Sequence, residues 1–216
     1  GELPTLAATN TRSIGPKLRN FSEDILERQI TISMVSEIWE KQTRSKKFKH
    51  EVERICELKG LKYISCPRPS NKRGGGAAII VDTSKYSCEK LEVLVPGKLE
   101  CVWAISRPKS LTKETKFKEI IICGFYSAPQ SRKNAKLLDH LISTIHQLLT
   151  KYPNCGWVIG GDKNQLPLGP LLGALPKARQ LVTRPTYQGR KIYDILLTNM
   201  GQYYSVPYIA PACQPD

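Results

Sequence analysis

The sequence lacks any run of about 18 uncharged apolar residues, the length that a membrane-spanning helix needs. Its first residues, Gly1–Pro4, contain no basic stretch followed by an apolar segment, so no secretory signal peptide is predicted. We therefore expect no membrane partner and a location inside the cell, either nuclear or cytoplasmic.

Metal-binding cysteine patterns are also missing. None of the seven cysteines forms a pair at C-x-x-C spacing and none lies near a histidine, which argues against a zinc site. Several cysteines, such as Cys101 and Cys123, lie within apolar runs and are predicted to be small core residues in a reducing compartment. No repeat, low-complexity tract or linker divides the chain, so one domain over residues 1–216 is expected.

Acidic residues are scarce relative to basic ones. The chain has 33 lysines and arginines against 19 aspartates and glutamates, for a net charge of +14. A solvated basic surface would account for any single cluster, but a total this large favours a polyanionic partner, with nucleic acid as the first candidate.

Hydrophobic periodicity predicts both helices and strands. Amphipathic helices are expected over Pro16–Arg28, Ser45–Leu58 and Ser131–Thr150. Strands are expected over the short apolar run Leu3–Thr9 and over Ile30–Val35, Leu61–Ser65, Ala77–Val81, Leu91–Val95, Cys101–Ile105, Ile120–Phe125, Trp157–Ile159 and Ile192–Thr198. Leu166–Lys177 is predicted to be a loop. The mixture of hairpins and strand–helix crossovers predicts mixed sheet with helices packed outside it.

Several of these strands end in, or contain, a polar residue. Alone, each such residue is an ordinary turn former or an exposed side chain. The set comprises Asn10, Glu37, Tyr126, Asp162, Asn164 and Asp194. The pair Gly160 and Gly161, just before Asp162, is expected to let the backbone approach a ligand closely.

Together these residues suit phosphodiester cleavage. Oxygen ligands are those that magnesium prefers, and Glu37 is a candidate to bind such an ion. Asp162 could hold the attacking water, while Asn10, Asn164 and Tyr126 could hold the phosphate oxygens as negative charge develops on them.

Six short segments resemble the endonuclease/exonuclease/phosphatase superfamily, and within it the endonuclease domain of LINE-type non-LTR retrotransposons. The segments occur in the family's order and span nearly the whole chain. They are Asn10-Thr11-Arg12, Ser36-Glu37-Ile38-Trp39, Arg73-Gly74-Gly75-Gly76, Phe125-Tyr126-Ser127-Ala128-Pro129, Gly160-Gly161-Asp162-Lys163-Asn164 and Tyr193-Asp194-Ile195-Leu196-Leu197-Thr198-Asn199.

The resemblance implies an α/β (α+β) fold, a four-layer sandwich of two mixed β-sheets packed face to face with helices outside. It also implies magnesium-dependent hydrolysis of a phosphodiester, with manganese as an alternative ion, and nicking of DNA at an insertion target. By analogy Glu37 holds the metal with help from Asn10, and Asp162 orients or deprotonates the water. Asn164 and Tyr126 stabilise the charge on the phosphate.

The same resemblance assigns Asp194 to orienting a catalytic histidine, which the family carries in a Ser-Asp-His segment beyond its last strand. That segment is missing from residues 1–216, and the histidines present, His50, His140 and His146, lie in predicted helices. The chain therefore looks like a C-terminally truncated domain or a decayed copy with weak or no activity, since a general acid or base contributes about 10²–10⁴-fold.

Lys163 replaces the family's usual apolar residue between Asp162 and Asn164, where it could contact phosphate or point to solvent. With Arg12, Arg73 and Arg184 it is a candidate to bind nucleic acid. Two alternatives stay open: a non-catalytic nucleic-acid-binding remnant, and a phosphohydrolase of the same superfamily acting on phosphoinositides or sphingolipids. A reverse transcriptase domain in the parent protein is a further expectation.

Overall fold

The computed structural model describes residues 3–40, 45–70, 73–186 and 191–209. Within them the strands form two mixed sheets. One has four strands in the order β1-β2-β4-β3, and the other has six in the order β5-β6-β7-β8-β10-β9. The strand bounds are β1 Leu6–Asn10, β2 Ile32–Ser36, β3 Leu61–Cys66, β4 Ala77–Asp82, β5 Tyr86–Lys90, β6 Glu100–Pro108, β7 Ile120–Tyr126, β8 Gly156–Asp162, β9 Arg179–Gln180 and β10 Asp194–Thr198.

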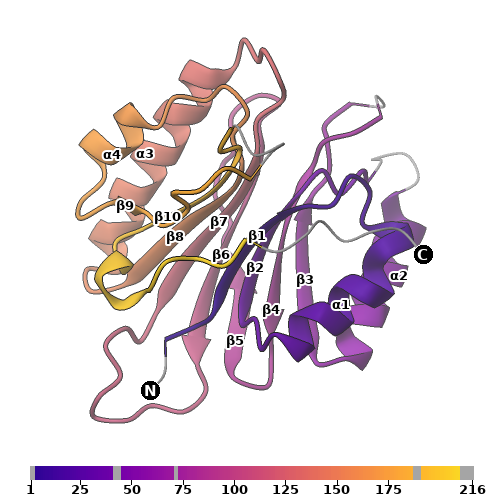
Figure 1. Cartoon of the computed structure of the whole chain (residues 1–216), viewed down its shortest axis with the longest axis horizontal. Helices are drawn as coiled ribbons and strands as arrows, with labels where there is room; N and C mark the ends of the chain where they lie inside the picture. Colours follow the sequence, from indigo (N-terminus) through magenta and orange to yellow (C-terminus); the bar gives the residue numbers. More distant parts are fainter. Residues whose placement is uncertain (1–2, 41–44, 71–72, 187–190, 210–216) are drawn as a thin grey trace.

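The two sheets face each other and the helices lie outside them, which gives four layers (Figure 1). A short 3-10 helix, Gly15–Lys17, leads into α1 Leu18–Glu27, which covers the four-stranded sheet together with α2 Ser45–Leu58. On the opposite side, α3 Asn134–Lys151 and α4 Gly169–Ala174 cover the six-stranded sheet. The predicted four-layer sandwich is therefore confirmed.

Each interface between layers has its own apolar core. Met34 and Ile79 of the smaller sheet pack with Ile122 and Val158 of the larger one to fill the centre. Apolar faces of α1 and α2 cover the outer side of the smaller sheet, and Leu141 of α3 belongs to the core on the outer side of the larger sheet. Side chains alternate between faces along each strand, so a strand buried on both sides contributes to two cores.

Two expectations about elements are wrong. Leu91–Val95 alternates like a strand, but its alternate residues Leu91, Val93 and Val95 pack against the core without a ladder to a neighbouring strand. The preceding residues instead form β5, an edge strand that pairs with β6. The loop predicted over Leu166–Lys177 contains the short helix α4, which starts just before a proline, a residue whose fixed φ suits a first helical turn.

The expectation about Gly160 and Gly161 is also corrected. A Cβ on Gly160 would meet the Met34 side chain of the facing sheet at 2.7 Å. A Cβ on Gly161 would overlap the Phe125 carbonyl of the adjacent strand. The missing side chains therefore allow close packing within the protein, rather than the approach of a ligand.

Candidate active site

The site residues come from both sheets, at one end of the strands. β1 and β2 run parallel, with Asn10 opposite Ser36 in the register, and β7 and β8 run parallel with Tyr126 opposite Asp162. Parallel neighbours end on the same side of a sheet, so each pair of strands places its polar terminal residues together. The antiparallel pairing of β10 with β8 adds Asp194 opposite Asp162.

The hydroxyl of Ser36 ties the two sheets together at this end. It donates to the Phe125 carbonyl and accepts from the Asp162 backbone N–H, each at 2.9 Å. Ser36 is fully buried, so both hydrogen bonds are shielded from water. Asp162 in the larger sheet is thereby held in register with the end of β2, where Glu37 follows.

A single amide joins the two main carboxylates. The Asn10 Nδ2 donates to Glu37 Oε1 at 3.0 Å and to Asp162 Oδ2 at 2.7 Å. The two carboxylate oxygens therefore lie no farther apart than the sum of these distances. Three residues that are distant in sequence thus meet at one point, as the strand-end pattern predicts.

The carboxyl group of Asp162 is buried, and burial raises its pKa. The Asn164 backbone N–H, which donates to Asp162 Oδ1 at 2.9 Å, and the Asn10 amide oppose that rise, while the charge of Glu37 adds to it. A carboxylate with a raised pKa is a better proton acceptor near neutral pH than an exposed aspartate.

Two possible donors lie beside Asp162. Asn164 has a positive φ of 41° and donates from Nδ2 to the Ser127 carbonyl at 2.7 Å, which fixes its amide. Tyr126 is buried, and burial, followed by the charges of Glu37 and Asp162, raises the pKa of its hydroxyl. The phenol therefore stays protonated at neutral pH and can donate a hydrogen bond.

Asp194 has the most perturbed carboxyl group of the site. Burial, followed by the charge of Asp162, raises its pKa to about 7. Its Oδ1 is buried and has no hydrogen-bond partner among the described residues. A buried oxygen without a hydrogen-bond partner destabilises the fold, so a hydrogen bond from a donor that reached Oδ1 would be strongly favourable.

The geometry fits a magnesium ion held partly by water. Among the described residues, no three His, Cys, Asp or Glu side chains lie close enough to hold a metal by themselves. Magnesium usually keeps several waters and takes only one or two protein carboxylates. Glu37 supplies such a carboxylate, and its Oε2 is oriented by the Trp39 indole N–H at 3.1 Å. Asp162 places a second carboxylate nearby, whereas Asn10 turns its amide N–H groups toward both carboxylates and its oxygen accepts from the Arg12 backbone N–H at 3.1 Å.

The four basic candidates differ in position. Arg12 is exposed directly after β1, and Arg73 is exposed with its guanidinium 4.6 Å from the centre of the Trp39 ring. Lys163 is half-buried, which lowers the pKa of its amine. Arg184 is exposed between β9 and β10, and it forms no hydrogen bond or ion pair with described residues. The structure therefore places three of the four beside residues of the site.

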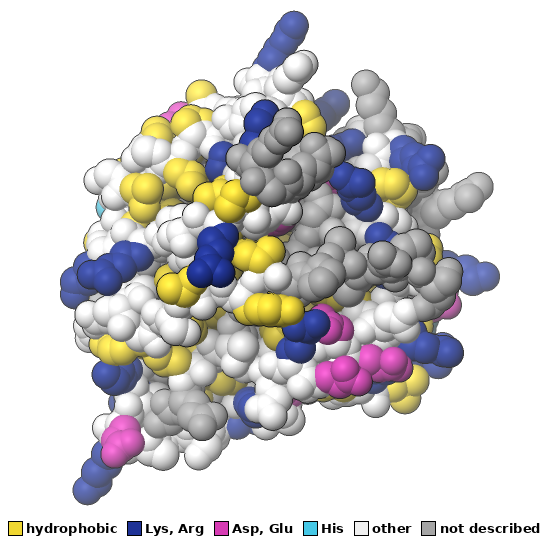
Figure 2. Space-filling view, viewed as in Figure 1, with side chains coloured by type: hydrophobic (Ala, Val, Ile, Leu, Met, Phe, Trp, Pro, Cys, Tyr) yellow, Lys and Arg dark blue, Asp and Glu magenta, His cyan; other side chains and the backbone are white. Residues whose placement is uncertain are grey.

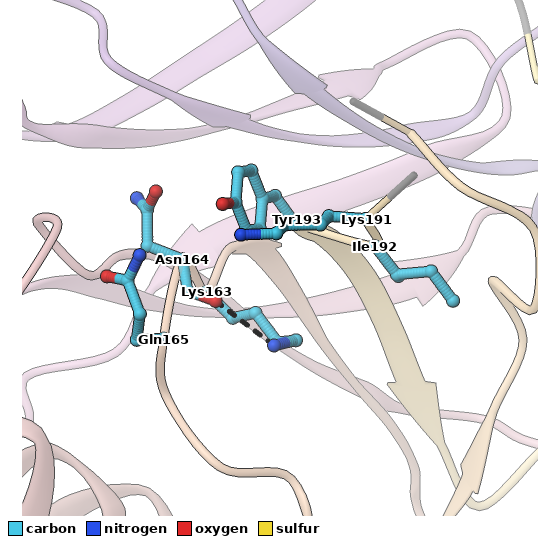
Figure 3. A pocket seen from close by; sticks show the side chains of 6 residues that line it. All are labelled: Lys163, Asn164, Gln165, Lys191, Ile192 and Tyr193. Carbon is cyan, nitrogen blue, oxygen red and sulfur yellow. Dashed lines mark hydrogen bonds between the residues drawn. The ribbon is translucent and has the colours of Figure 1, made fainter. Parts of the chain in front are cut away.

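A hollow of about 290 Å³ opens beside Asn164 (Figure 3). It is lined by Lys163, Asn164, Gln165, Lys191, Ile192 and Tyr193, and so combines two amines, two amides and an aromatic ring.

Elsewhere, Figure 2 shows basic side chains spread over the visible face, with no single stripe. No helix in the described ranges is long and apolar enough to cross a membrane.

The histidines lie elsewhere, as the sequence predicts. His50 is exposed in α2, and His146 is exposed in α3, where it bonds with the Ala174 carbonyl. His140 is buried and accepts a hydrogen bond from the Trp103 indole at 3.1 Å. None of them reaches Asp194 through a hydrogen bond.

Sequence analysis missed four residues that support the site. Ser36 and Ser127 adjoin the residues it selected, so their positions next to Glu37 and Tyr126 were a usable signal. Arg68 and Glu100 form an ion pair at 2.9 Å with side chains 18% and 9% exposed, and nothing in their local sequence marks them.

Comparisons with known proteins show the fold. No protein-family model and no curated protein sequence matches the chain. Among solved structures, the endonuclease domain of TRAS1, a telomere-specific non-LTR retrotransposon, superposes with a TM-score of 0.57 at 14% identity, covering 90% of this chain and 84% of that one. An endonuclease/exonuclease/phosphatase family protein from Bacteroides thetaiotaomicron gives 0.58 at 17% identity, with coverage of 91% and 84%.

A third solved structure, ANGEL2, described as a 2′,3′-cyclic phosphatase, has a TM-score of 0.60 at 13% identity and coverage of 92% and 84%. These proteins share an architecture with the chain, and their descriptions range from an endonuclease domain to a 2′,3′-cyclic phosphatase. The resemblance stated from the six sequence segments is therefore borne out at the level of the fold.

Proposed function

We propose, from the premise that this chain has the endonuclease/exonuclease/phosphatase fold, that it is a metal-dependent phosphodiester hydrolase that nicks DNA. The observation that carries the proposal is the Asn10 amide joining Glu37 and Asp162. It gathers a candidate metal ligand and a candidate base at one point, which a structural role alone does not require. The fold by itself supports only a hydrolase, nuclease or phosphatase.

The chain's residues divide the chemistry between them. Glu37, whose carboxylate is oriented by the Asn10 amide, would hold the ion, which would supply positive charge to offset the charge that builds on the phosphate. Asp162 would accept a proton from a water molecule as the water oxygen attacks phosphorus. The bond between phosphorus and the leaving oxygen then breaks. Tyr126 and Asn164 would donate hydrogen bonds to the non-bridging oxygens in that transition state.

DNA is the proposed substrate because the charge of +14 suits a long polyanion better than a small anion. The likeness to a retrotransposon endonuclease domain supports the same choice. Arg12, Arg73 and Lys163 would contact the phosphates beside the scissile bond.

Activity of residues 1–216 is proposed to be weak. The leaving oxygen needs a proton, and no described histidine bonds to Asp194, whose Oδ1 has no partner there. A histidine oriented by Asp194 would supply that proton, and general acid catalysis contributes about 10²–10⁴-fold. The same unpartnered oxygen favours the second candidate, a nucleic-acid-binding module that has lost its chemistry.

Nicking of supercoiled plasmid in Mg²⁺ tests the first prediction. We expect slow nicking by the 216-residue chain, abolished by EDTA, by Asp162→Asn and by Glu37→Gln, with Asp139→Asn on the exposed side of α3 as the control. Adding a Ser-Asp-His segment after residue 216 should raise the rate. Nicking that Asp162→Asn leaves unchanged contradicts the catalytic proposal, and binding with no nicking in either form favours the second candidate.

A further inference from the structure

An ion pair joins the two sheets beside the site. Arg68 follows β3 of the smaller sheet, and Glu100 begins β6 of the larger one. The Arg68 Nε donates to Glu100 Oε1 at 2.9 Å, and Nη2 lies 3.5 Å from Oε2. Their side chains are only 18% and 9% exposed, so the pair is well shielded from solvent.

The pair also holds the glycine loop that precedes β4. Glu100 Oε1 accepts from the Gly76 backbone N–H at 2.8 Å, and Arg68 Nη1 donates to the Arg73 carbonyl at 3.1 Å. A Cβ on Gly75, whose φ is 73°, would overlap both side chains. Only glycine therefore fits between the ion pair and the turn of the loop.

The glycine loop in turn holds the backbone of the candidate metal ligand. Glu37 N–H donates to the Gly76 carbonyl at 2.9 Å, and Trp39 N–H donates to the Gly75 carbonyl at 3.0 Å. Glu37 and Trp39 both have positive φ, 54° and 58°. Non-glycine residues adopt such a backbone only where surrounding contacts impose it, and these two hydrogen bonds provide them.

The same pair contacts the other half of the site. Glu100 lies opposite Tyr126 in the register of β6 and β7. The Arg68 guanidinium lies 5.7 Å from the centre of the Tyr126 ring, within the range of a cation–π contact. The Arg68–Glu100 pair thus contacts both the glycine loop that holds the Glu37 backbone and the ring of Tyr126 in the other sheet.

We propose that Arg68 and Glu100 are positioning residues that fix Glu37 for a divalent ion and Tyr126 for the phosphate. The proposal rests on the function proposed above. Three of the five Arg68 N–H donors are directed at Glu100 and the Arg73 carbonyl, so most of its hydrogen-bonding capacity holds protein groups.

Binding of Tb³⁺, a luminescent substitute for the divalent ion, tests the pair without relying on catalysis. Trp39, bonded to Glu37, would sensitise the emission. Removing a residue that orients a metal ligand typically weakens metal affinity about 10–100-fold. We expect Arg68→Met to weaken Tb³⁺ binding within this range. Arg68→Lys, which keeps the charge, should recover most of the affinity.

Arg107→Met is the matched control. Arg107 lies at the other end of β6 and pairs with Glu119 at the similar distance of 3.0 Å, so its loss should leave Tb³⁺ affinity unchanged. If Arg68→Met keeps the parent's affinity, or if Arg107→Met loses as much, the positioning role is overturned. Should Arg68→Met fail to fold, Glu100→Gln replaces it, with the same expected loss and the same overturning result.

A second readout separates this proposal from the proposed function. The Trp39 indole N–H resonance reports directly on its bond to Glu37, while Trp103 and Trp157 are buried elsewhere. Arg68→Met should shift the Trp39 resonance and leave the other two in place, whether or not the protein binds metal. An unmoved Trp39 resonance overturns the positioning role. Absence of Tb³⁺ binding by the parent protein, with the resonance shifted, overturns only the metal site.

Discussion

At the scale of single residues, Asp194 combines burial with an unpartnered oxygen, and both favour its protonated form. Burial and the charge of Asp162 raise its pKa to about 7, against about 3.9 for an ordinary aspartate. Between these two values the folded state keeps a proton that the unfolded state has released. The contribution of the Asp194 carboxyl group to the free energy of unfolding therefore falls as pH rises from about 4 to about 7.

Asp194→Asn should remove this pH dependence. We expect the free energy of unfolding of the variant, relative to the parent, to rise by more than about 1 kcal/mol between pH 4 and pH 8, since one pKa unit corresponds to about 1.4 kcal/mol. Urea unfolding at several pH values measures it. Asp139→Asn, on the exposed face of α3, should show no such trend, and a difference constant with pH for Asp194→Asn would contradict the assignment.

At the scale of elements, the end of β2 is joined to β7 and β8 through Ser36. Ser36→Ala leaves the Phe125 carbonyl and the Asp162 N–H without their hydroxyl partner in a buried place. We expect a loss of about 1–3 kcal/mol in the free energy of unfolding, because buried polar groups without partners cost that much. Thermal and urea unfolding measure the loss.

The same strand offers a control. Ser33 is also buried in β2, but its hydroxyl has no hydrogen-bond partner among the described residues. Ser33→Ala should therefore be neutral or stabilising. Equal losses for the two variants would show that Ser36 does not connect the sheets as described.

Sequence reasoning succeeded where an element carries its own pattern. The stripe of α3 and the apolar runs of β7 and β8 are local signals, and the structure has these elements. The polar residues at strand ends were likewise found by position, and the structure brings Asn10, Glu37 and Asp162 together.

It failed where a residue acts through a distant partner. Leu91–Val95 alternates, but whether it forms a β-ladder depends on which segment of the protein lies beside it in the fold. Glu100 and Arg68 are 32 residues apart, and no local pattern indicates that they pair. The same holds for Gly160, whose missing side chain is explained by Met34 of the other sheet.

At the scale of the whole molecule, we expect the charge of +14 to govern the proposed association with DNA. Binding of a DNA duplex should weaken linearly in log–log form as salt rises, because bound cations are released from the phosphates. Arg12→Gln and Arg73→Gln should each reduce the slope by about 1. Titrations at several salt concentrations measure the slope.

Lys116 is the control for this experiment. It lies in the loop before β7, at the opposite end of that strand from Tyr126, and stacks on Tyr203. Lys116→Gln should leave the slope unchanged, and DNA binding without salt dependence would contradict the charge argument. Competition with phosphoinositide vesicles distinguishes DNA from anionic lipid.

A reverse transcriptase domain in the parent protein stays a prediction, as do the single domain over residues 1–216 and the nuclear or cytoplasmic location.

The amide that joins Glu37 and Asp162 has a consequence for biosynthesis. Asn10 and Asp162 are 152 residues apart, so the ribosome must add that many residues after Asn10 before Asp162 exists to accept its hydrogen bond. Closing so long a loop is slow compared with forming a helix. If the proposed function holds, a growing polypeptide therefore cannot capture the ion or cut nucleic acid until translation has passed β8.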